Sequence, residues 1–172
     1  ILNVGSIEER KNALSAVQAL MMLPEQIHLV IVGRHTEYTD KIERFIKENK
    51  LEERVHIISN VPFDDLPAFY QLAEIFVYPS RFEGFGIPII EALYSGIPVV
   101  AATGSCLEEA GGPDSIYVHP DNIKGMANAF KQIYSDTERK KEMIEKGQKF
   151  AKRFSEEKQA EEILNIYKKL MK

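Results

Sequence analysis

Glu83 and Glu91 are the residues of this sequence best placed to do chemistry. They lie in the segment Pro79-Ser80-Arg81-Phe82-Glu83-Gly84-Phe85-Gly86-Ile87-Pro88-Ile89-Ile90-Glu91-Ala92-Leu93, which follows an apolar run of strand length. The segment predicts a helix that begins near Ile87, because proline is tolerated in the first turn of a helix. The free backbone N–H groups of about Phe85 to Ile87 would then be available to bind an oxyanion.

The spacing of the two carboxylates bears on the chemistry they could do. Eight helical residues span about 12 Å, whereas the acid and base of a glycosidase lie about 5–9.5 Å apart. Part of the span is loop, so the comparison is loose, but it argues against hydrolysis. Two carboxylates that grip hydroxyl groups at two places along one extended ligand fit better. On spacing alone, a helix cap plus one exposed glutamate is the simpler explanation.

A second candidate site is the loop Gly5-Ser6-Ile7-Glu8-Glu9-Arg10-Lys11-Asn12. A glycine after a strand allows the backbone to approach a ligand closely. The adjacent cations Arg10 and Lys11 are predicted to open a helix, whose first N–H groups favour an anion. The combination indicates a diphosphate site, although such pairs are more often ordinary surface residues. The loop lacks a Gly-x-Gly-x-x-Gly pattern, so it gives no support for a dinucleotide cofactor.

The remaining reactive side chains give weaker signals. A third loop, Thr103-Gly104-Ser105-Cys106-Leu107-Glu108-Glu109, could border a phosphate or a sugar. Cys106 has no base beside it in the sequence and is interpreted as a small structural residue. The four histidines show no metal-ligand spacing, and His35 alone is a candidate for lining a ligand cleft.

Composition and charge narrow the choice of partners. The chain has 172 residues, 44% of them hydrophobic, and a net charge of −4, which does not favour a nucleic-acid partner. No apolar run approaches the roughly 18 residues of a membrane span.

A single cysteine suits a reducing compartment, so a cytoplasmic location is expected. The chain opens on Ile1–Val4 without an initiator methionine, so we expect a boundary inside a longer protein.

The C-terminal stretch from Glu138 to Lys172 carries eleven basic and seven acidic residues. Such a stretch could contact an anionic membrane surface peripherally. A pair of solvated helices of mixed charge is the simpler interpretation.

Short apolar runs alternate with amphipathic stretches of helix length. The runs lack polar alternation, which indicates strands buried on both faces. The alternation predicts an α/β fold with a doubly wound, mostly parallel, six-stranded sheet and extra C-terminal helices. Ligands of such sheets bind beyond the carboxyl ends of the strands. The expected strands are Ile1–Val4, His28–Val32, Val55–Ile58, Ile75–Tyr78, Pro98–Ala101 and Ile116–Val118, and the expected helices are Ala13–Leu23, Thr39–Lys50, Asp65–Leu72, Ile87–Tyr94, Ile123–Tyr134, Glu138–Lys152 and Glu156–Met171, the last capped by Ser155.

Taken together, these residues resemble the group 1 family of retaining glycosyltransferases of the GT-B fold, across essentially the whole chain. The family signature Glu-Gly-Phe-Gly-x-Pro-x-x-Glu-Ala is complete from Glu83 to Ala92. The resemblance implies that residues 1–172 form a single Rossmann-like, nucleotide-sugar-binding domain, the C-terminal half of the fold, without the N-terminal acceptor domain. Supporting matches are Val4-Gly5 with Arg10-Lys11-Asn12, Gly33, Gly96-Ile97-Pro98-Val99-Val100, Glu108-Glu109 and Phe154-Ser155.

The resemblance implies roles for the candidate residues. Lys11 with Arg10 would hold the donor diphosphate, Glu83 the donor sugar and Glu91 the ribose. The donor would be GDP-mannose or a UDP-hexose. No metal or other cofactor would be required, because cations and a helix terminus offset the charge of the leaving diphosphate. The other implied donor-binding residues are Gly5, Ser6, Gly33, Arg34, Asn60, Val61, Ser80, Gly84, Phe85, Gly86 and Ile87.

At full length the resemblance implies a retaining hexosyltransferase of polysaccharide biosynthesis with a glycan or lipid-linked acceptor. The acceptor site and general base would lie in the missing domain, so this chain alone is expected to be inactive. Two positions depart from the family pattern. Ser6 replaces a common arginine, as in a subgroup of mannosyltransferases, and Arg10 is expected to substitute for it. Glu156 replaces a common tryptophan. The alternatives are a non-catalytic binding module and half of a nucleotide-sugar epimerase.

Overall fold

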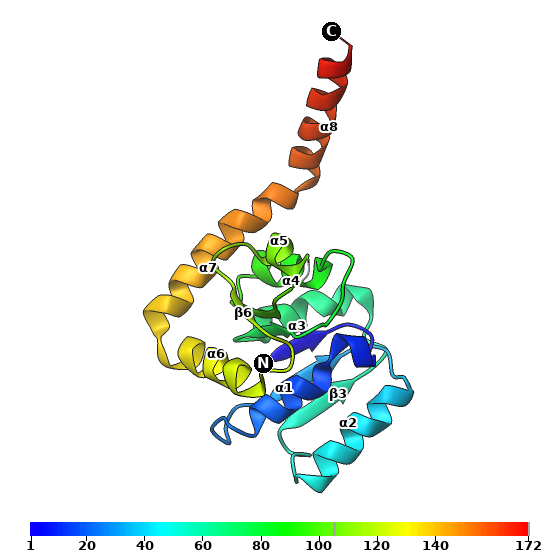
Figure 1. The fold of residues 1–172 in the computed structure, drawn as a ribbon, viewed down its shortest axis with the longest axis vertical. Coiled ribbons are helices and arrows are strands. Elements are labelled where there is room, and N and C mark those ends of the chain that lie inside the picture. Colours follow the sequence, from blue (N-terminus) through cyan, green and yellow to red (C-terminus); the bar gives the residue numbers. More distant parts are fainter. Residues whose placement is uncertain (105, 172) are drawn as a thin grey trace.

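The structure, a computed structural model, describes residues 1–104 and 106–171, and within these ranges six parallel strands form one sheet (Figure 1). The strand order is β3-β2-β1-β4-β5-β6, which is the order of a Rossmann-type sheet. The predicted α/β doubly wound class is therefore confirmed. The strands are β1 (Leu2–Val4), β2 (Leu29–Val32), β3 (Val55–Ile58), β4 (Phe76–Tyr78), β5 (Val99–Ala102) and β6 (Ile116–Val118).

Helices cover both faces of the sheet because successive strand side chains point to opposite sides. Leu29, Ile31 and Val77 pack into one core with α1, α2 and α6. Phe76 and Tyr78 belong to a second core with α3, α4 and α5. The helices are α1 (Ala13–Leu20), α2 (Glu37–Glu48), α3 (Leu66–Leu72), α4 (Ile87–Tyr94), α5 (Leu107–Gly111), α6 (Ile123–Ser135), α7 (Thr137–Ala151) and α8 (Glu156–Leu170), with 3-10 turns η1 (Glu9–Lys11), η2 (Phe63–Asp65) and η3 (Lys152–Phe154).

Several predicted boundaries were wrong by one to three residues, and local chemistry explains the larger differences. Helix α1 ends at Leu20 instead of Leu23. Helix α2 begins at Glu37 because Thr36 caps it, and it cannot reach Lys50, whose φ of 55° is left-handed. Strand β5 begins after Pro98, which has no N–H to donate to a ladder. Helix α5, five residues long, was not predicted, because it is too short to show a helical period.

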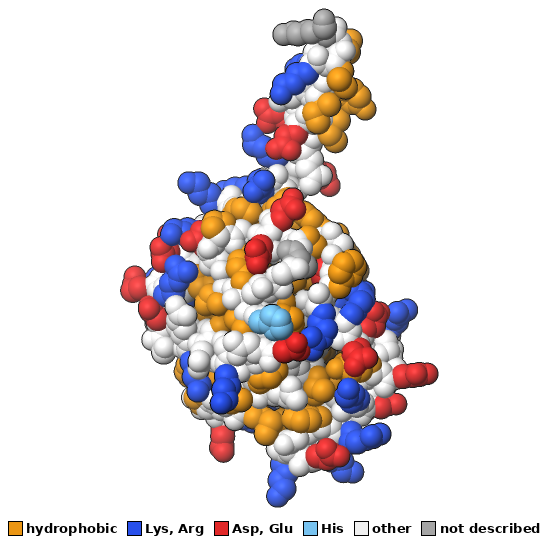
Figure 2. Space-filling model, in the orientation of Figure 1, with side chains coloured by type: hydrophobic (Ala, Val, Ile, Leu, Met, Phe, Trp, Pro, Cys, Tyr) orange, Lys and Arg blue, Asp and Glu red, His pale blue; other side chains and the backbone are white. Residues whose placement is uncertain are grey.

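Helix α8 leads away from the body of the domain (Figure 1). Ser155 caps it as predicted, and its side chain accepts from the N–H of Lys158. The helix has an apolar face, but no residue of α8 is buried. Figure 2 shows apolar side chains gathered along one side of this helix. The exposed residues of that face include Ile163, Leu164, Tyr167 and Leu170.

The basic C-terminal stretch is partly neutralised along its own helices. Arg139 and Lys146 pair with Glu142, Lys141 pairs with Glu138, and Lys158 pairs with Glu161. Such spacing is typical of solvated helix surfaces. Peripheral membrane contact stays a prediction. Among the described residues, no helix is both long and apolar enough to cross a bilayer.

Close approach of two loops requires glycine at position 33. A Cβ atom there would lie 1.8 Å from the carbonyl oxygen of Gly5 and 2.8 Å from its carbon. The backbone N–H of Gly5 in turn donates to Val32 at 2.9 Å, so the loops after β1 and β2 cannot separate without breaking this ladder. Backbone packing alone therefore requires glycine at position 33, independently of any role in ligand binding.

We predict that Gly33→Ala lowers the free energy of unfolding by about 2–4 kcal/mol, because backbone must move to admit the methyl group. Urea unfolding of the chain measures this. Gly84→Ala is the control, since a Cβ there meets no atom within 4 Å. It should change stability by less than about 0.5 kcal/mol. Equal stability of the two variants would contradict the close approach.

Candidate functional site

The loops after β1 and β4 meet at the carboxyl edge of the sheet. The backbone N–H of Arg81 donates to the carbonyl of Arg10 at 2.8 Å, and the hydroxyl oxygen of the buried Ser80 lies 3.2 Å from the same carbonyl. Neighbouring parallel strands end at one edge, so residues about seventy positions apart come together. The structure thus brings the first two predicted loops into one site.

The side chain of Asn12 links three of the loops at this edge of the sheet. Asn12 is buried and left-handed, with φ of 57°. Its amide donates to the carbonyls of Pro79 at 3.2 Å and Pro120 at 2.9 Å, which joins the loops after β1, β4 and β6. The left-handed turn also ends η1 before α1 begins at Ala13. The prediction that Arg10 and Lys11 open a helix was therefore wrong, because they end a 3-10 turn and their side chains reach Glu83.

Lys11 and Glu83 form the centre of the site. Lys11 Nζ lies 2.6 Å from Glu83 Oε1, and the two side chains are 13% and 10% exposed. Ser80 Oγ donates to the same carboxylate oxygen at 2.6 Å, and Arg10 Nη1 lies 3.4 Å from it. Lys11 Nζ also donates to the hydroxyl of Tyr78 at 2.6 Å. Arg10 also pairs with Glu8, with Arg10 Nε 3.0 Å from Glu8 Oε2, so the two cations of the cluster are balanced by two carboxylates.

Glu83 is ionised at neutral pH. Burial alone would raise the pKa of Glu83, but hydrogen bonds from Lys11, Ser80 and Tyr78 and the charge of Lys11 outweigh it. The pKa of Glu83 is therefore held below its ordinary value of 4.5. Burial, followed by the charge of Glu83, raises the pKa of Tyr78, so its hydroxyl stays protonated.

Helix α4 begins four residues after Glu83, and the N–H groups of its first turn have no partner within the helix. Gly86 begins the helix with φ of 109°, and no described side chain caps it. A Cβ on Gly86 would lie 3.0 Å from Leu107, so this glycine is also required for packing against α5. Gly84 is exposed and open to solvent. Pro88 lies in the first turn as predicted. The terminus suits an anion.

Glu91 lies on α4 and is held by a residue that sequence reasoning missed. The Tyr70 hydroxyl donates to Glu91 Oε2 at 2.7 Å. Tyr70 is 2% exposed, and burial followed by the bond to Glu91 raises its pKa. Beside this pair lies a mainly apolar cavity of about 250 Å³. It is lined by Phe63, Leu66, Pro67, Tyr70, Glu91, Tyr94 and Ser95.

The other predicted binding residues lie around this centre. Gly5 has φ of 146°, and Ser6 hydrogen-bonds to the Glu8 side chain, which lowers the pKa of Glu8. Arg34 is 78% exposed, with Nη2 3.8 Å from Glu8. Asn60 is left-handed and exposed, and Val61 packs against the second core. Ile87 is exposed at the start of α4, and Phe85 makes an edge contact with Phe154 at 5.6 Å.

The third predicted loop contributes through Cys106 and α5. The Cys106 thiol donates to the carbonyl of Glu83 at 3.2 Å, consistent with its interpretation as a structural residue. Leu107 to Glu109 form the start of α5 and not a loop. Ser105 lies outside the described residues.

His35 faces α2. It is exposed, with Nε2 3.9 Å from Asp40 and 3.7 Å from Glu43. These three side chains are the one group of possible metal ligands among the described residues, and all are exposed. The expectation that the site works without a metal stays a prediction.

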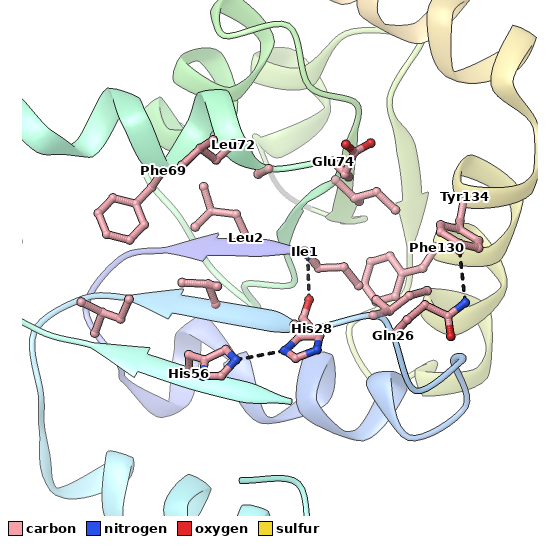
Figure 3. A pocket seen from close by; sticks show the side chains of 15 residues that line it. Ile1, Leu2, Gln26, His28, His56, Phe69, Leu72, Glu74, Phe130 and Tyr134 are labelled. Carbon is pink, nitrogen blue, oxygen red and sulfur yellow. Dashed lines mark hydrogen bonds between the residues drawn. The ribbon is translucent and has the colours of Figure 1, made fainter. Parts of the chain in front are cut away.

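A separate cavity of about 450 Å³ lies at the amino-terminal edge of the strands (Figure 3). His28 and His56 stack beside it with ring centroids 5.4 Å apart, and the amino group of Ile1 donates to the His28 carbonyl. Phe69, Phe130 and other apolar side chains form its walls. None of the residues predicted to bind a ligand lines it, so the candidate site is the cluster at the carboxyl edge.

Comparison with known proteins bears on the family and the fold. The sequence model of the family described as "Glycosyl transferases group 1" matches residues 1–150. O-antigen chain mannosyltransferase B of Escherichia coli is 31% identical over 98% of this chain and 45% of its own length. The chain spans less than half the length of the first curated relatives it matches.

Two solved structures share the fold. Sucrose-phosphate synthase from Thermosynechococcus elongatus superposes with a TM-score of 0.87 at 25% identity, over 99% of this chain and 45% of that chain. Anabaena HepE in complex with UDP and glucose superposes with a TM-score of 0.88 at 22% identity, over 98% of this chain and 48% of that one.

We predict that Glu83→Gln lowers the free energy of unfolding at neutral pH by about 1–3 kcal/mol, because Lys11 loses its charged partner. The pKa of Glu83 is lower in the folded chain than its ordinary value of 4.5. The stability that ionised Glu83 contributes is therefore fully present above pH 4.5 and is lost as the pH falls through the pKa of the folded chain. The difference in free energy of unfolding between wild type and Glu83→Gln should therefore become smaller in acid. Urea unfolding across pH measures it, with exposed Glu25→Gln as the control. A difference that does not depend on pH would contradict the ion pair.

Proposed function

This chain belongs to the group 1 glycosyl transferases, and we propose that it binds the nucleotide-sugar donor of a retaining hexosyl transfer. One observation carries the proposal. Two cations, Lys11 and Arg10, gather around Glu83 just before the N-terminus of α4, which has no side-chain cap among the described residues and on which Glu91 also lies. Cations, helix N–H groups and two carboxylates in one place suit a ligand with both phosphates and hydroxyl groups.

Lys11 and Arg10 would bind the donor diphosphate. Arg10 is 46% exposed, and its guanidinium would exchange its contact with Glu8 for a two-pronged contact with phosphate, whereas Lys11 supplies a compact charge. The N–H groups at the start of α4 would bind the same anion. Together they would stabilise the negative charge that grows on the diphosphate as the bond to the sugar breaks.

The carboxylates would bind hydroxyl groups on either side of the diphosphate. Glu83, with the open backbone at Gly84, would hold the sugar. Glu91 would accept hydrogen bonds from the ribose hydroxyls. The cavity beside Glu91 has apolar and aromatic walls, which suit the face of a base, and Val61 and Asn60 precede its residue Phe63 along the chain. Gly5, Ser6, Gly33 and Arg34 would border the ligand on the side of β1 and β2.

In the transfer itself, the bond between the anomeric carbon and the diphosphate breaks and an acceptor hydroxyl takes its place on the same face. The hydroxyl proton passes to a base. We place the acceptor, a glycan or lipid-linked sugar, and that base in the part of the relatives that this chain does not cover. By itself the chain would bind donor without transferring it. No bound metal is needed where two cations and a helix terminus face the leaving group.

GDP-mannose is the first candidate donor, because the relative from Escherichia coli is named a mannosyltransferase. A UDP-hexose is the second, because the superposed Anabaena protein was solved with UDP and glucose. The role would be polysaccharide biosynthesis.

We predict that the chain binds either GDP or UDP selectively, without added metal, and that Glu91→Ala weakens this binding about tenfold, the effect of removing a hydrogen bond to a charged group. Calorimetric titration with both nucleotides and their sugar conjugates measures it. Glu48→Ala is the matched control, since Glu48 is exposed at the far end of α2. If neither nucleotide binds, or Glu91→Ala binds as wild type does, the donor site is not where we place it.

A further inference from the structure

Two buried tyrosines each contact one of the two carboxylates of the site. Tyr78 ends β4 and is 2% exposed. Its hydroxyl accepts a hydrogen bond from Lys11 Nζ at 2.6 Å and lies near Glu83, whose pKa it lowers. Tyr70, on α3 and also 2% exposed, donates to Glu91 Oε2 at 2.7 Å. Neither contact is part of the sequence signature that contains the glutamates.

The two rings belong to one aromatic row. Phe76, which is fully buried, lies between them, with its ring centroid 5.5 Å from that of Tyr70 and 5.9 Å from that of Tyr78. Phe76 and Tyr78 point to the same face of β4, because they are two residues apart on a strand. A close-packed core leaves such rings little freedom. Each hydroxyl is therefore fixed in place before any ligand arrives.

We propose that Tyr78 and Tyr70 are positioning residues of the donor site: Tyr78 orients Lys11 and Glu83 for the diphosphate and sugar, and Tyr70 orients Glu91 for the ribose. The assignment of the diphosphate and sugar to Tyr78 and of the ribose to Tyr70 rests on the proposed function. The contacts of the two tyrosines with Lys11 and Glu91 do not depend on it.

The direction of the hydrogen bonds at Tyr78 follows from charge. An ammonium group has no acceptor, so Lys11 must donate to the tyrosine oxygen, and the tyrosine proton is then free to reach Glu83. Tyr78 thus holds the cation and the carboxylate in one geometry. At the other end, Tyr70 donates to one oxygen of Glu91 and leaves the second oxygen for a ligand.

The test removes each hydroxyl separately. Tyr78→Phe and Tyr70→Phe keep the rings, and Tyr117→Phe is the matched control, because that hydroxyl donates to the Gly112 carbonyl at 2.7 Å outside the cluster. Titrations use inorganic diphosphate, GDP and UDP. Tyr78→Phe should lower the affinity for inorganic diphosphate and for the nucleotide about tenfold. Tyr70→Phe should lower the affinity for the nucleotide about tenfold and leave the affinity for inorganic diphosphate unchanged. A general loss of stability in Tyr70→Phe would weaken the binding of both ligands and would not spare inorganic diphosphate.

A ligand-free measurement separates this inference from the proposed function. Carbon-13 NMR of the glutamate carboxyl groups should show the Glu83 signal moving in Tyr78→Phe only, and the Glu91 signal moving in Tyr70→Phe only. If wild type binds neither nucleotide nor diphosphate, the proposed function fails, and the two carboxyl signals still decide the positioning roles. Carboxyl signals that stay at their wild-type positions in both variants would overturn the inference.

Discussion

The paired charges of Lys11 and Glu83 are the interaction on which the site depends. A carboxylate that is only 10% exposed is unfavourable unless it is paired and hydrogen-bonded. Glu83 meets this condition through Lys11, Ser80 and Tyr78, which come from the loop after β1 and from β4 and its following loop. Since the partners lie about seventy residues apart, the pair forms only when the central strands of the sheet are correctly aligned. Asn12, with its bonds to two other loops, holds that alignment.

This pairing also explains how an open sheet edge can be both stable and ready for a ligand. The cluster places the cations Lys11 and Arg10 at this edge, and the N-terminus of α4 has no described side-chain cap. Within the described residues no buried polar side-chain atom lacks a partner. The groups that suit phosphate are thus the first backbone N–H groups of α4 and the half-exposed guanidinium of Arg10, which pairs with Glu8 and Glu83 in the absence of a ligand.

The sheet and α4 could be predicted from the sequence, because both depend on local patterns of residues. Apolar runs without alternation identified the strands, and Gly86 with Pro88 identified the start of α4. Sequence reasoning failed where the answer depends on residues far apart. Nothing local shows that Asn12 turns left-handed and ends η1, so Arg10 and Lys11 were assigned to a helix start. Tyr70 and Tyr78 read as ordinary apolar residues, and only the packing of α3 on β4 and α4 shows that their hydroxyls meet Glu91 and Glu83.

A crystal structure of this chain with the nucleotide that binds it would test the central claim most directly. We expect the diphosphate within hydrogen-bonding distance of Lys11 and of the N–H groups that begin α4, with the ribose at Glu91. A nucleotide seated elsewhere, such as in the apolar cavity at the amino-terminal edge of the sheet, or with its diphosphate away from Lys11, would contradict it.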